Sequence, residues 1–359
     1  MGQPQMTTHQ TRTRRKAKAE APREAGPFVS VLIPVRNEAG FIGRCLQALA
    51  AQDYPRERFE VIVLDGESTD ATEYEVKHTA ESAGLTVYVA TNKKRTTAAG
   101  MNLGLSLAKG QIIVKVDGHT RVDPGFISAS VKALAESGAD AVGGPIETRG
   151  HGTVGRAIAL AMSSPFGVGD TTFRHSQVEQ WTDSVPFAAY RRDVFERVGY
   201  FAEDIDRGED DEFNYRLRDA GGRILLTPAI RCVYYSRPTL AALARQYWGY
   251  GLAKASVLGR HPGRLRARHL APSALVLALA GGGLLSFIKR RFVLVPAVAA
   301  SAYWTANLVA SLRIARRGNW REAPYLPLAF VTIHFSAGAG MLAGALRGLV
   351  RRARNASRD

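Results

Sequence analysis

Four clusters of polar residues each follow a short apolar run: Arg36-Asn37-Glu38, Asp65-Gly66-Glu67-Ser68, Asn92-Lys93-Lys94-Arg95 and Asp117-Gly118-His119. Asp117 could give a carboxylate oxygen to a divalent cation that bridges a diphosphate, and His119 could add an imidazole or orient a ligand. Asp65 stands at the end of its run, where its carboxylate could accept hydrogen bonds from a base or a ribose. Such residues also form ordinary turns and helix caps, so these clusters alone leave both interpretations open.

The segment that carries these clusters alternates β-rich runs with helix-like stretches. We expect strands over 28–34, 59–64, 86–90 and 111–116, and helices over about 41–52, after Thr69 and over about 97–108. This βαβα order predicts an α/β fold with a mostly parallel sheet and helices on both faces. Ligands of such sheets bind outside the carboxyl ends of the strands. The four clusters are therefore expected to meet along one rim.

Four consecutive acids, Glu209 to Glu212, follow Gly208 and open a predicted helix that ends at Gly221-Gly222. Acids are favoured at a helix N-terminus, and for this segment alone that structural role is the preferred interpretation. Their crowding should raise the pKa of at least one of the four carboxyl groups. The preceding residues, 140–208, are rich in Gly, Thr and Ser and predict long loops over a site.

Charge is distributed unevenly along the 359 residues. The formal charge is +16, yet residues 28–253 carry a net −3, whereas residues 1–27 carry +4 and residues 254–359 carry +15. A nucleic-acid-binding protein would be expected to place its basic surface on the folded domain. Here the excess lies in a tail and beside apolar segments, which predicts contact with anionic membrane lipids and no nucleic-acid partner.

Three long uncharged stretches follow, over 270–288, 292–312 and 323–346. The first two are long enough to cross hydrocarbon and are joined by Lys289-Arg290-Arg291, so they predict a transmembrane hairpin. The third contains His334 and a Gly-rich run, which fits either a packed membrane helix or a helix at the interface. If it crossed, the five arginines after residue 346 would lie outside, against the positive-inside rule. We therefore expect it to lie at the cytoplasmic interface or to re-enter.

These patterns divide the chain into five parts. We expect a disordered basic arm at 1–27, a sheet-and-helix domain at 28–240, interfacial basic and aromatic helices at 241–269, the hairpin at 270–312, and a basic loop, the third apolar segment and a basic tail at 313–359. No cleavable export signal is expected, because no apolar signal core follows Arg14-Arg15.

The ordered motifs resemble those of family 2 glycosyltransferases of GT-A fold. The matching segments are 31–38, 61–72, Asp117-Gly118-His119 and 208–212. The resemblance covers most of the chain and is closest to the membrane-attached branch that builds exopolysaccharides such as succinoglycan. It implies a GT-A domain, which is Rossmann-like with a mostly parallel sheet and helices on both faces, followed by a C-terminal α-helical membrane region.

The resemblance also implies residues that bind the donor. Pro34, Asn37 and Glu38 would form the first loop to contact the nucleotide, and Asp65 would bind its base or ribose. The usual Asp-Asp-Gly-Ser of the family reads Asp65-Gly66-Glu67-Ser68 here, which removes one carboxylate. The donor implied is a nucleoside-diphosphate sugar.

Metal binding and base catalysis are implied in the same way. Asp117 would match the first Asp of the family's Asp-x-Asp metal motif, with His119 in the place of the second, and the metal would be Mg²⁺ or Mn²⁺. Asp210 would be the general base that acts on the acceptor hydroxyl. Arg245-Gln246-Tyr247-Trp248 partly resembles the Gln-x-x-Arg-Trp element found at the acceptor and diphosphate end of processive relatives. The other substrate-binding candidates are Ser68, Arg95, Asn102, Glu209, Arg245 and Trp248.

We therefore expect an inverting glycosyltransferase of cell-surface or exopolysaccharide synthesis, with a lipid-linked saccharide as acceptor. It would be a multi-pass protein of the inner membrane with its catalytic domain in the cytoplasm. Such transfer needs a carboxylate to take the acceptor proton and a cation or basic groups to stabilise the leaving diphosphate. One alternative is a polyprenyl-phosphate glycosyltransferase, which has less need of a base because its acceptor is a phosphate. Another is a non-catalytic nucleotide-sugar-binding membrane scaffold, which would need neither Asp117 nor Asp210.

Overall fold

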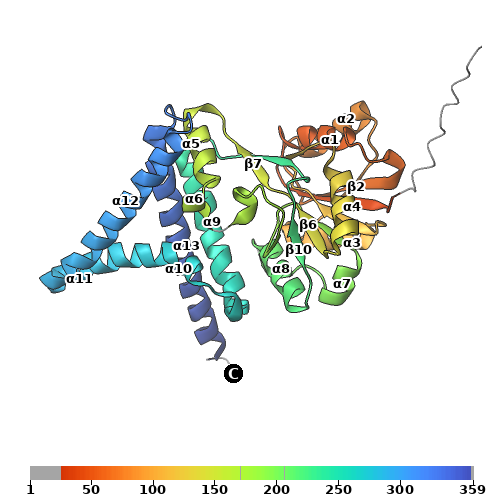
Figure 1. Ribbon diagram of the computed structural model, residues 1–359. Helices are drawn as coiled ribbons and strands as arrows, with labels where there is room; N and C mark the ends of the chain where they lie inside the picture. Colours follow the sequence, from red (N-terminus) through yellow and green to blue (C-terminus); the bar gives the residue numbers. More distant parts are fainter. Residues whose placement is uncertain (1–25, 170, 206, 357–359) are drawn as a thin grey trace, which may run out of the picture.

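The computed structural model describes residues 26–169, 171–205 and 207–356. The basic arm expected over 1–27 lies outside the described residues except for its last two. Within them, an eight-stranded sheet has the order β3-β2-β1-β4-β9-β6-β10-β8. The domain that contains it lies to one side of the C-terminal helices (Figure 1). Its strands are β1 (Val29–Val35), β2 (Phe59–Asp65), β3 (Val87–Thr91), β4 (Ile112–Lys115), β6 (Ala141–Gly143), β8 (Gln180–Thr182), β9 (Ala189–Arg191) and β10 (Ile224–Leu226).

The first half of this sheet is parallel. Strand β1 pairs in parallel with β2 and β4, and β2 pairs in parallel with β3, whereas β9 is antiparallel to both of its neighbours. The runs of β1 and β2 are apolar at almost every position because the sheet is buried on both faces. The strands expected over residues 28–116 all form, and their carboxyl ends lie at one edge.

Helices cover both faces of the sheet, which confirms the expected fold class. One apolar core joins the sheet to α1 (Ile42–Ala50), α2 (Thr72–Ala83) and α4 (Phe126–Ser137). The other joins the opposite face to α3 (Thr97–Leu107), α7 (Asp193–Val198) and α8 (Glu209–Asp219). The expected acidic helix is α8. Its apolar residues Phe213 and Leu217 pack in the second core and hold the helix against that face of the sheet.

A second, three-stranded sheet connects this domain to the C-terminal helices. It consists of β5 (Thr120–Val122), β11 (Cys232–Tyr235) and β7 (Ile146–Arg149), in the order β5-β11-β7. Strand β5 follows the Asp117-Gly118-His119 cluster directly. Strand β7 leads into α5 (Gly152–Met162), and β11 leads into α9 (Leu240–Arg260). This small sheet therefore places the polar cluster close to the long helices.

The described part of the C-terminal region contains three helical segments that are long and apolar enough to cross a membrane: His269–Ile288, Arg290–Ala315 and Ala323–Val350. The first comprises α10 (Ala267–Val276), a π-helical turn η4 (Leu277–Gly281) and α11 (Gly282–Ile288); α12 (Leu294–Ala315) and α13 (Leu326–Ala356) follow. The most apolar windows of the first two segments are only 11% and 6% buried, against 33% for the third. The first two thus present apolar surface outward, whereas the third packs on protein.

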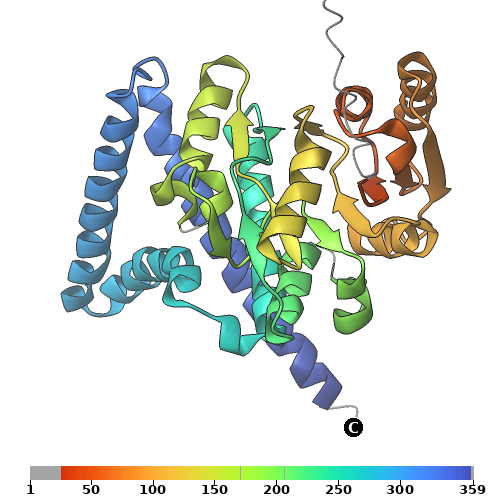
Figure 2. The same ribbon diagram turned by 45° about the vertical axis from the view of Figure 1, so that its right-hand side comes forward.

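The partner of α13 is α9, beside which it lies in both views (Figures 1 and 2). Small residues allow this close approach: a Cβ on Gly340 would lie 2.3 Å from the carbonyl oxygen of Trp248, and one on Gly251 would lie 2.2 Å from that of Ala337. Helix α9 is in turn joined to α8, because Lys254 Nζ lies 2.6 Å from Asp211 Oδ2. The acidic helix and α13 are therefore held together through α9.

Candidate active site

A cavity of about 1800 Å³ opens at the carboxyl ends of the parallel strands and extends to the C-terminal helices. Three of the four polar clusters contribute to its lining. Its residues on the strand side include Pro34, Arg36, Glu38, Asn92, Arg95, Lys115, Asp117, His119, Glu209 and Asp210. The cluster after β2 does not line this cavity.

The residues of that second cluster bond to one another and to the first loop. Ser68 Oγ donates to Asp65 Oδ1 at 2.5 Å, the backbone N–H of Asn37 donates to Ser68 Oγ at 2.9 Å, and that of Thr69 donates to Asn37 Oδ1 at 2.8 Å. Asn37 holds a left-handed backbone conformation with φ of 56°, which Asn tolerates better than most residues. Asn37, Asp65 and Ser68 thus join the loops after β1 and β2 and support the segment that carries Glu38.

Asp117 and His119 line the strand side of the cavity and suit a divalent cation. His119 Nδ1 lies 3.0 Å from Glu38 Oε1, a carboxylate contact typical of metal-binding histidines, which leaves Nε2 for a metal. No cluster of three or more metal-ligating side chains occurs in the described part of the chain. Two protein ligands suit a Mg²⁺ or Mn²⁺ ion that takes its remaining ligands from substrate phosphates and water.

The surroundings of His119 act on its charge as well. Burial alone would lower the pKa of His119, but the hydrogen bond with Glu38 and the charge of Asp117 raise it above the ordinary value. A proton and a cation would therefore compete for this imidazole.

Asp210 pairs with a lysine that the sequence analysis did not single out. Lys115 Nζ lies 2.6 Å from Asp210 Oδ2, 2.7 Å from Asp210 Oδ1 and 3.0 Å from Glu209 Oε1. The Lys115 side chain is 6% exposed, whereas that of Asp210 is 35% exposed and reaches the cavity. The signal in the sequence was a single lysine in an otherwise apolar run, since a buried ammonium needs a charged partner.

This arrangement gives Asp210 an unusual acidity. Burial, followed by the charges of Glu209 and Asp117, raises the pKa of Asp210 to about 7, although the Lys115 ammonium opposes the shift. Burial alone would lower the pKa of Lys115, but the charges of Asp210, Glu209 and Asp117 hold it well above its ordinary value. The lysine therefore stays charged, while the carboxyl group can gain or lose a proton near neutral pH.

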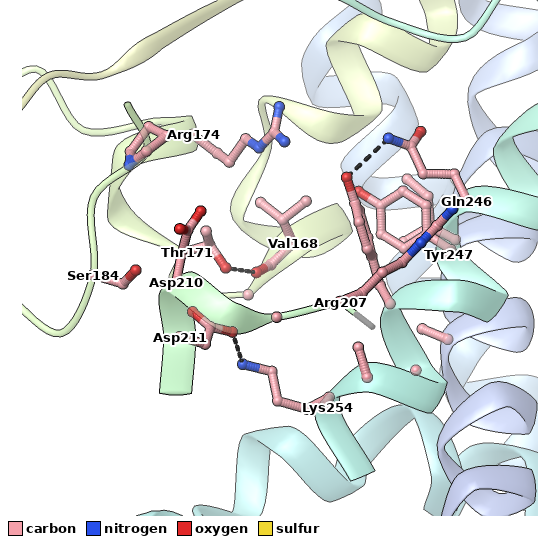
Figure 3. A pocket seen from close by; sticks show the side chains of 18 of the residues that line it. Val168, Thr171, Arg174, Ser184, Arg207, Asp210, Asp211, Gln246, Tyr247 and Lys254 are labelled. Atoms are coloured by element: carbon pink, nitrogen blue, oxygen red, sulfur yellow. Dashed lines mark hydrogen bonds and ion pairs between the residues drawn. The ribbon is translucent and has the colours of Figure 1, made fainter. Parts of the chain in front are cut away.

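The four acids of α8 have separate partners. Glu209 and Asp210 contact Lys115, Asp211 contacts Lys254 (Figure 3), and Glu212 binds Arg216 at 2.8 Å. Burial alone would raise the pKa of Glu212, but its contacts with Arg216 and His261 bring it below the ordinary value. Crowding thus raises a carboxyl pKa, as expected, but burial is the larger cause and the effect falls on Asp210.

The remaining predicted residues divide into two groups. Arg95, which also pairs with Glu67, and Arg245 line the cavity. Asn102 does not: its amide nitrogen donates to the carbonyl oxygen of Phe201 at 2.9 Å. Trp248 does not line it either; it lies on α9 with its backbone against α13, and the residue is 40% exposed.

Toward the C-terminal helices the lining of the cavity becomes apolar. Leu275 of α10, Ala299 of α12, and Ile333 and Met341 of α13 contribute to it. Between this part and Asp210 lie polar residues, among them Arg174, Arg207, Gln246 and Tyr247 (Figure 3). The cavity therefore brings together two possible metal ligands, a carboxyl group suited to accept a proton, and an apolar region.

Comparison with known proteins adds a family relationship. A model of glycosyl transferase family 2 matches residues 30–199. The succinoglycan biosynthesis protein ExoA of Rhizobium meliloti (strain 1021) is 30% identical over 315 residues, which cover 86% of this chain and 92% of the relative. A dolichyl N-acetyl-alpha-D-glucosaminyl phosphate 3-beta-D-2,3-diacetamido-2,3-dideoxy-beta-D-glucuronosyltransferase of Methanococcus voltae is 26% identical over 337 residues, 89% of this chain and 98% of the relative.

Among solved structures, the mannosyltransferase PcManGT from Pyrobaculum calidifontis, in complex with GDP-Man and Mn²⁺, superposes with a TM-score of 0.57 and 24% identity. The match covers 93% of this chain and 91% of the other. At this identity the likeness shows a shared fold, which agrees with the sheet order and the helical layers described above.

Proposed function

Because this chain belongs to glycosyltransferase family 2, we propose that it is an inverting enzyme that transfers a sugar from a nucleoside-diphosphate sugar to a hydroxyl of a lipid-linked saccharide, in cell-surface or exopolysaccharide synthesis. One observation carries the proposal. Asp210, with a pKa of about 7, lies in a cavity that runs from Asp117 and His119 to the apolar faces of α10, α12 and α13. A donor can enter from the strand ends and a lipid-linked acceptor from the helices.

In this proposal the donor binds at the strand ends, where Pro34, Glu38 and Arg95 line the cavity. Asp117 and His119 would hold Mg²⁺ or Mn²⁺, and the ion would neutralise negative charge on the diphosphate. Asp210 accepts the proton of the acceptor hydroxyl while that oxygen attacks the anomeric carbon and the diphosphate leaves from the opposite side. This opposite-side attack inverts the configuration of the sugar.

Lys115 acts on the base rather than on the substrate. Its contacts with both Asp210 oxygens fix the orientation of the carboxylate and favour the ionised form that a base requires. Each carboxylate oxygen has a second lone pair, so the acceptor hydroxyl can still bind.

The acceptor class is supported by two features. A polyprenyl phosphate would have less need of a base, so the ionisation behaviour of Asp210 favours a hydroxyl acceptor over this alternative. The name of the Methanococcus voltae relative describes transfer onto a dolichyl phosphate that already carries a sugar. The scaffold alternative is set aside, because the chain belongs to a family of glycosyltransferases.

We further propose that the α10–α12 hairpin spans the inner membrane with the catalytic domain in the cytoplasm, and that α13 lies at the cytoplasmic interface. The support comes from α9, which contacts α13 along its length and also forms ion pairs with the domain through Lys254 with Asp211 and Arg260 with Asp204. Charged side chains are costly in hydrocarbon. A helix held against α9 is therefore better placed at the membrane surface.

The test is transfer by purified protein in membranes, with a panel of nucleotide sugars and extracted lipid-linked saccharides. Asp210→Asn should retain nucleotide binding but lose turnover by about two to four orders of magnitude, the usual scale of general-base catalysis. Asp193→Asn, an exposed acid at the start of α7, is the matched control and should behave as wild type. Retention of the donor's anomeric configuration, or near-normal turnover by Asp210→Asn, would overturn the assignment.

A further inference from the structure

A group of arginines and tyrosines lies between Asp210 and the apolar end of the cavity. Tyr234 of β11 and Gln246 and Tyr250 of α9 form its centre, since Gln246 Nε2 donates to the Tyr234 hydroxyl at 2.7 Å and to the Tyr250 hydroxyl at 2.9 Å. Arg174 lies over the Tyr234 ring, with its guanidinium carbon 5.0 Å from the ring centroid. Arg237 lies two residues after the end of β11, in the connection to α9. All five residues line the cavity.

This cluster presents mainly hydrogen-bond donors to the cavity. The Tyr234 and Tyr250 oxygens already accept from Gln246, so their own O–H groups remain to be donated, and they have no acceptor among the described residues. Gln246 is 7% exposed and its Oε1 has no described partner. A hydroxyl of an attached saccharide would satisfy that oxygen.

The arginines of this region carry charge without a described carboxylate to neutralise it. Arg174, Arg237 and Arg245 line the cavity, and none forms an ion pair with an acid in the described ranges. Among the described residues, two acids of this part of the cavity, Asp210 and Asp211, are already engaged by Lys115 and Lys254. In Figure 3 the side chain of Arg174 extends toward the side of the cavity that carries Gln246 and Tyr247. Guanidinium groups are well suited to bind phosphate oxygens through paired hydrogen bonds.

We propose that Arg174, Arg237, Tyr234 and Tyr250 form a phosphate subsite that holds the phosphate or diphosphate linking the acceptor saccharide to its lipid. The inference rests on the proposed function, because it places the lipid anchor of the acceptor on the membrane side of Asp210. The apolar lining by Leu275, Ile333 and Met341 would then receive the first part of the lipid chain.

The position of the cluster favours the lipid carrier over the donor as the source of the phosphate. The donor side of the cavity has its own polar groups, Asp117, His119 and Arg95. The Tyr234 ring marks the boundary with the donor side, since its centroid lies 6.0 Å from that of His119. From there Gln246 and Tyr250 continue the cluster on α9, which packs against α13. A phosphate bound there would lie between the reacting hydroxyl and the apolar helices, as the anchor of a lipid-linked saccharide must.

The test uses the full-length protein in detergent, with farnesyl diphosphate and farnesol as probes for the lipid anchor and UDP and GDP as probes for the donor. Wild type should bind farnesyl diphosphate about tenfold or more tightly than farnesol. The Arg174→Gln/Arg237→Gln double variant should lose about ten- to a hundredfold of farnesyl diphosphate affinity, the scale of charged hydrogen bonds, and leave farnesol binding unchanged. Tyr250→Phe, which keeps the ring, should show a smaller loss.

The matched control is Arg223→Gln. Arg223 also stacks on an aromatic ring, that of Trp181 at 4.4 Å, but it does not line the cavity, so affinity for farnesyl diphosphate should be unchanged. Nucleotide binding by the double variant should also equal that of wild type. If the double variant instead loses UDP or GDP affinity and keeps farnesyl diphosphate affinity, the subsite serves the donor and the proposal is wrong. Equal binding of both farnesyl probes by wild type would also overturn it.

The binding measurements test the phosphate subsite separately from the proposed catalytic function, which is tested by turnover of Asp210→Asn. If Asp210→Asn transfers sugar normally while the double variant loses farnesyl diphosphate affinity, the base assignment fails and the phosphate subsite stands. Thermal unfolding of each variant shows whether it is folded. If the double variant does not fold, Arg174→Lys and Arg237→Lys, which keep the charge and lose the paired donor geometry, should each weaken farnesyl diphosphate binding by less than the Gln variants.

Discussion

The ammonium nitrogen of Lys115 lies within 2.7 Å of both carboxylate oxygens of Asp210. The contact joins the last residue of β4 to the first turn of α8, two elements that are far apart in the sequence. Burial and the charges of Glu209 and Asp117 raise the pKa of Asp210 to about 7, and the Lys115 ammonium is the group that opposes this rise. The ionisation of the proposed base therefore depends on a balance between burial and a single lysine.

The first prediction concerns the pH dependence of transfer. A base works in its ionised form, so the raised pKa of Asp210 makes activity fall as pH decreases through about 7, by about tenfold per pH unit below it. We expect kcat/KM for the acceptor to rise to a plateau above about pH 8 at saturating donor. Nucleotide affinity measured by calorimetry over the same range separates this effect from donor binding. A profile that is flat from about pH 5.5 to about pH 8 would contradict the prediction.

The second prediction concerns Lys115→Met. Burial, Glu209 and Asp117 would still raise the pKa of Asp210, and the opposing positive charge would be gone, so the acidic limb of the pH–rate profile should move to higher pH. Activity at pH 7 should fall by about tenfold or more and recover in part at alkaline pH, while Lys115→Arg should lose less. Lys132→Met, an exposed lysine on α4, serves as control. A uniform loss at every pH would indicate a structural role alone.

The third prediction concerns the metal. Asp117→Ala should abolish metal-dependent binding of the donor, because Asp117 is the carboxylate proposed to hold the ion. His119→Ala should weaken that dependence or change the preferred ion, and Glu38→Gln should have a milder effect, since Gln can still accept from His119 Nδ1–H. Calorimetry with and without Mg²⁺ or Mn²⁺ measures this. Equal donor affinity of wild type with and without either ion would rule out the site.

The sheet and part of the site could be predicted from sequence because they depend on local patterns. β1, β2 and β4 are apolar runs of a doubly covered sheet, and the strand-end rule placed Glu38, Arg95 and Asp117 in the cavity. The same rule predicted Asp65 and Ser68 at this rim, but they do not line the cavity, and Ser68 donates its hydroxyl to Asp65. Residue type and position do not reveal whether a polar side chain meets a ligand or a neighbouring loop.

Other features depend on contacts between distant residues. Lys115 and Asp210 are 95 positions apart, and no local pattern pairs them. Asn102 binds the backbone of Phe201 and so lies away from the cavity. The Gly-rich run of α13 was compatible with a packed membrane helix or with a helix at the interface, because hydropathy depends on composition and does not reveal packing partners. In the structure, Gly340 packs against the backbone of Trp248 in α9.

The last prediction concerns the topology of the C-terminal helices. If α10 to α12 form a hairpin with the domain inside, a cysteine replacing Lys289 in its turn should react with an impermeant thiol reagent added outside intact cells, while one replacing Ala356 at the end of α13 should not. The native Cys45 and Cys232 are buried, so labelling reports the introduced thiols.

Two observations place Ala356 on the cytoplasmic side. Helix α13 packs on α9, which Lys254 joins to Asp211 of the catalytic domain. The arginines near the end of α13 also favour the cytoplasmic side. Positive-inside statistics oppose the result at Lys289, where three basic residues would lie outside; we expect the length and apolarity of the two helices to outweigh that preference. Labelling at Ala356 from outside would show that α13 spans the membrane, whereas no labelling at either position, with labelling of both after permeabilisation, would show that the hairpin does not cross.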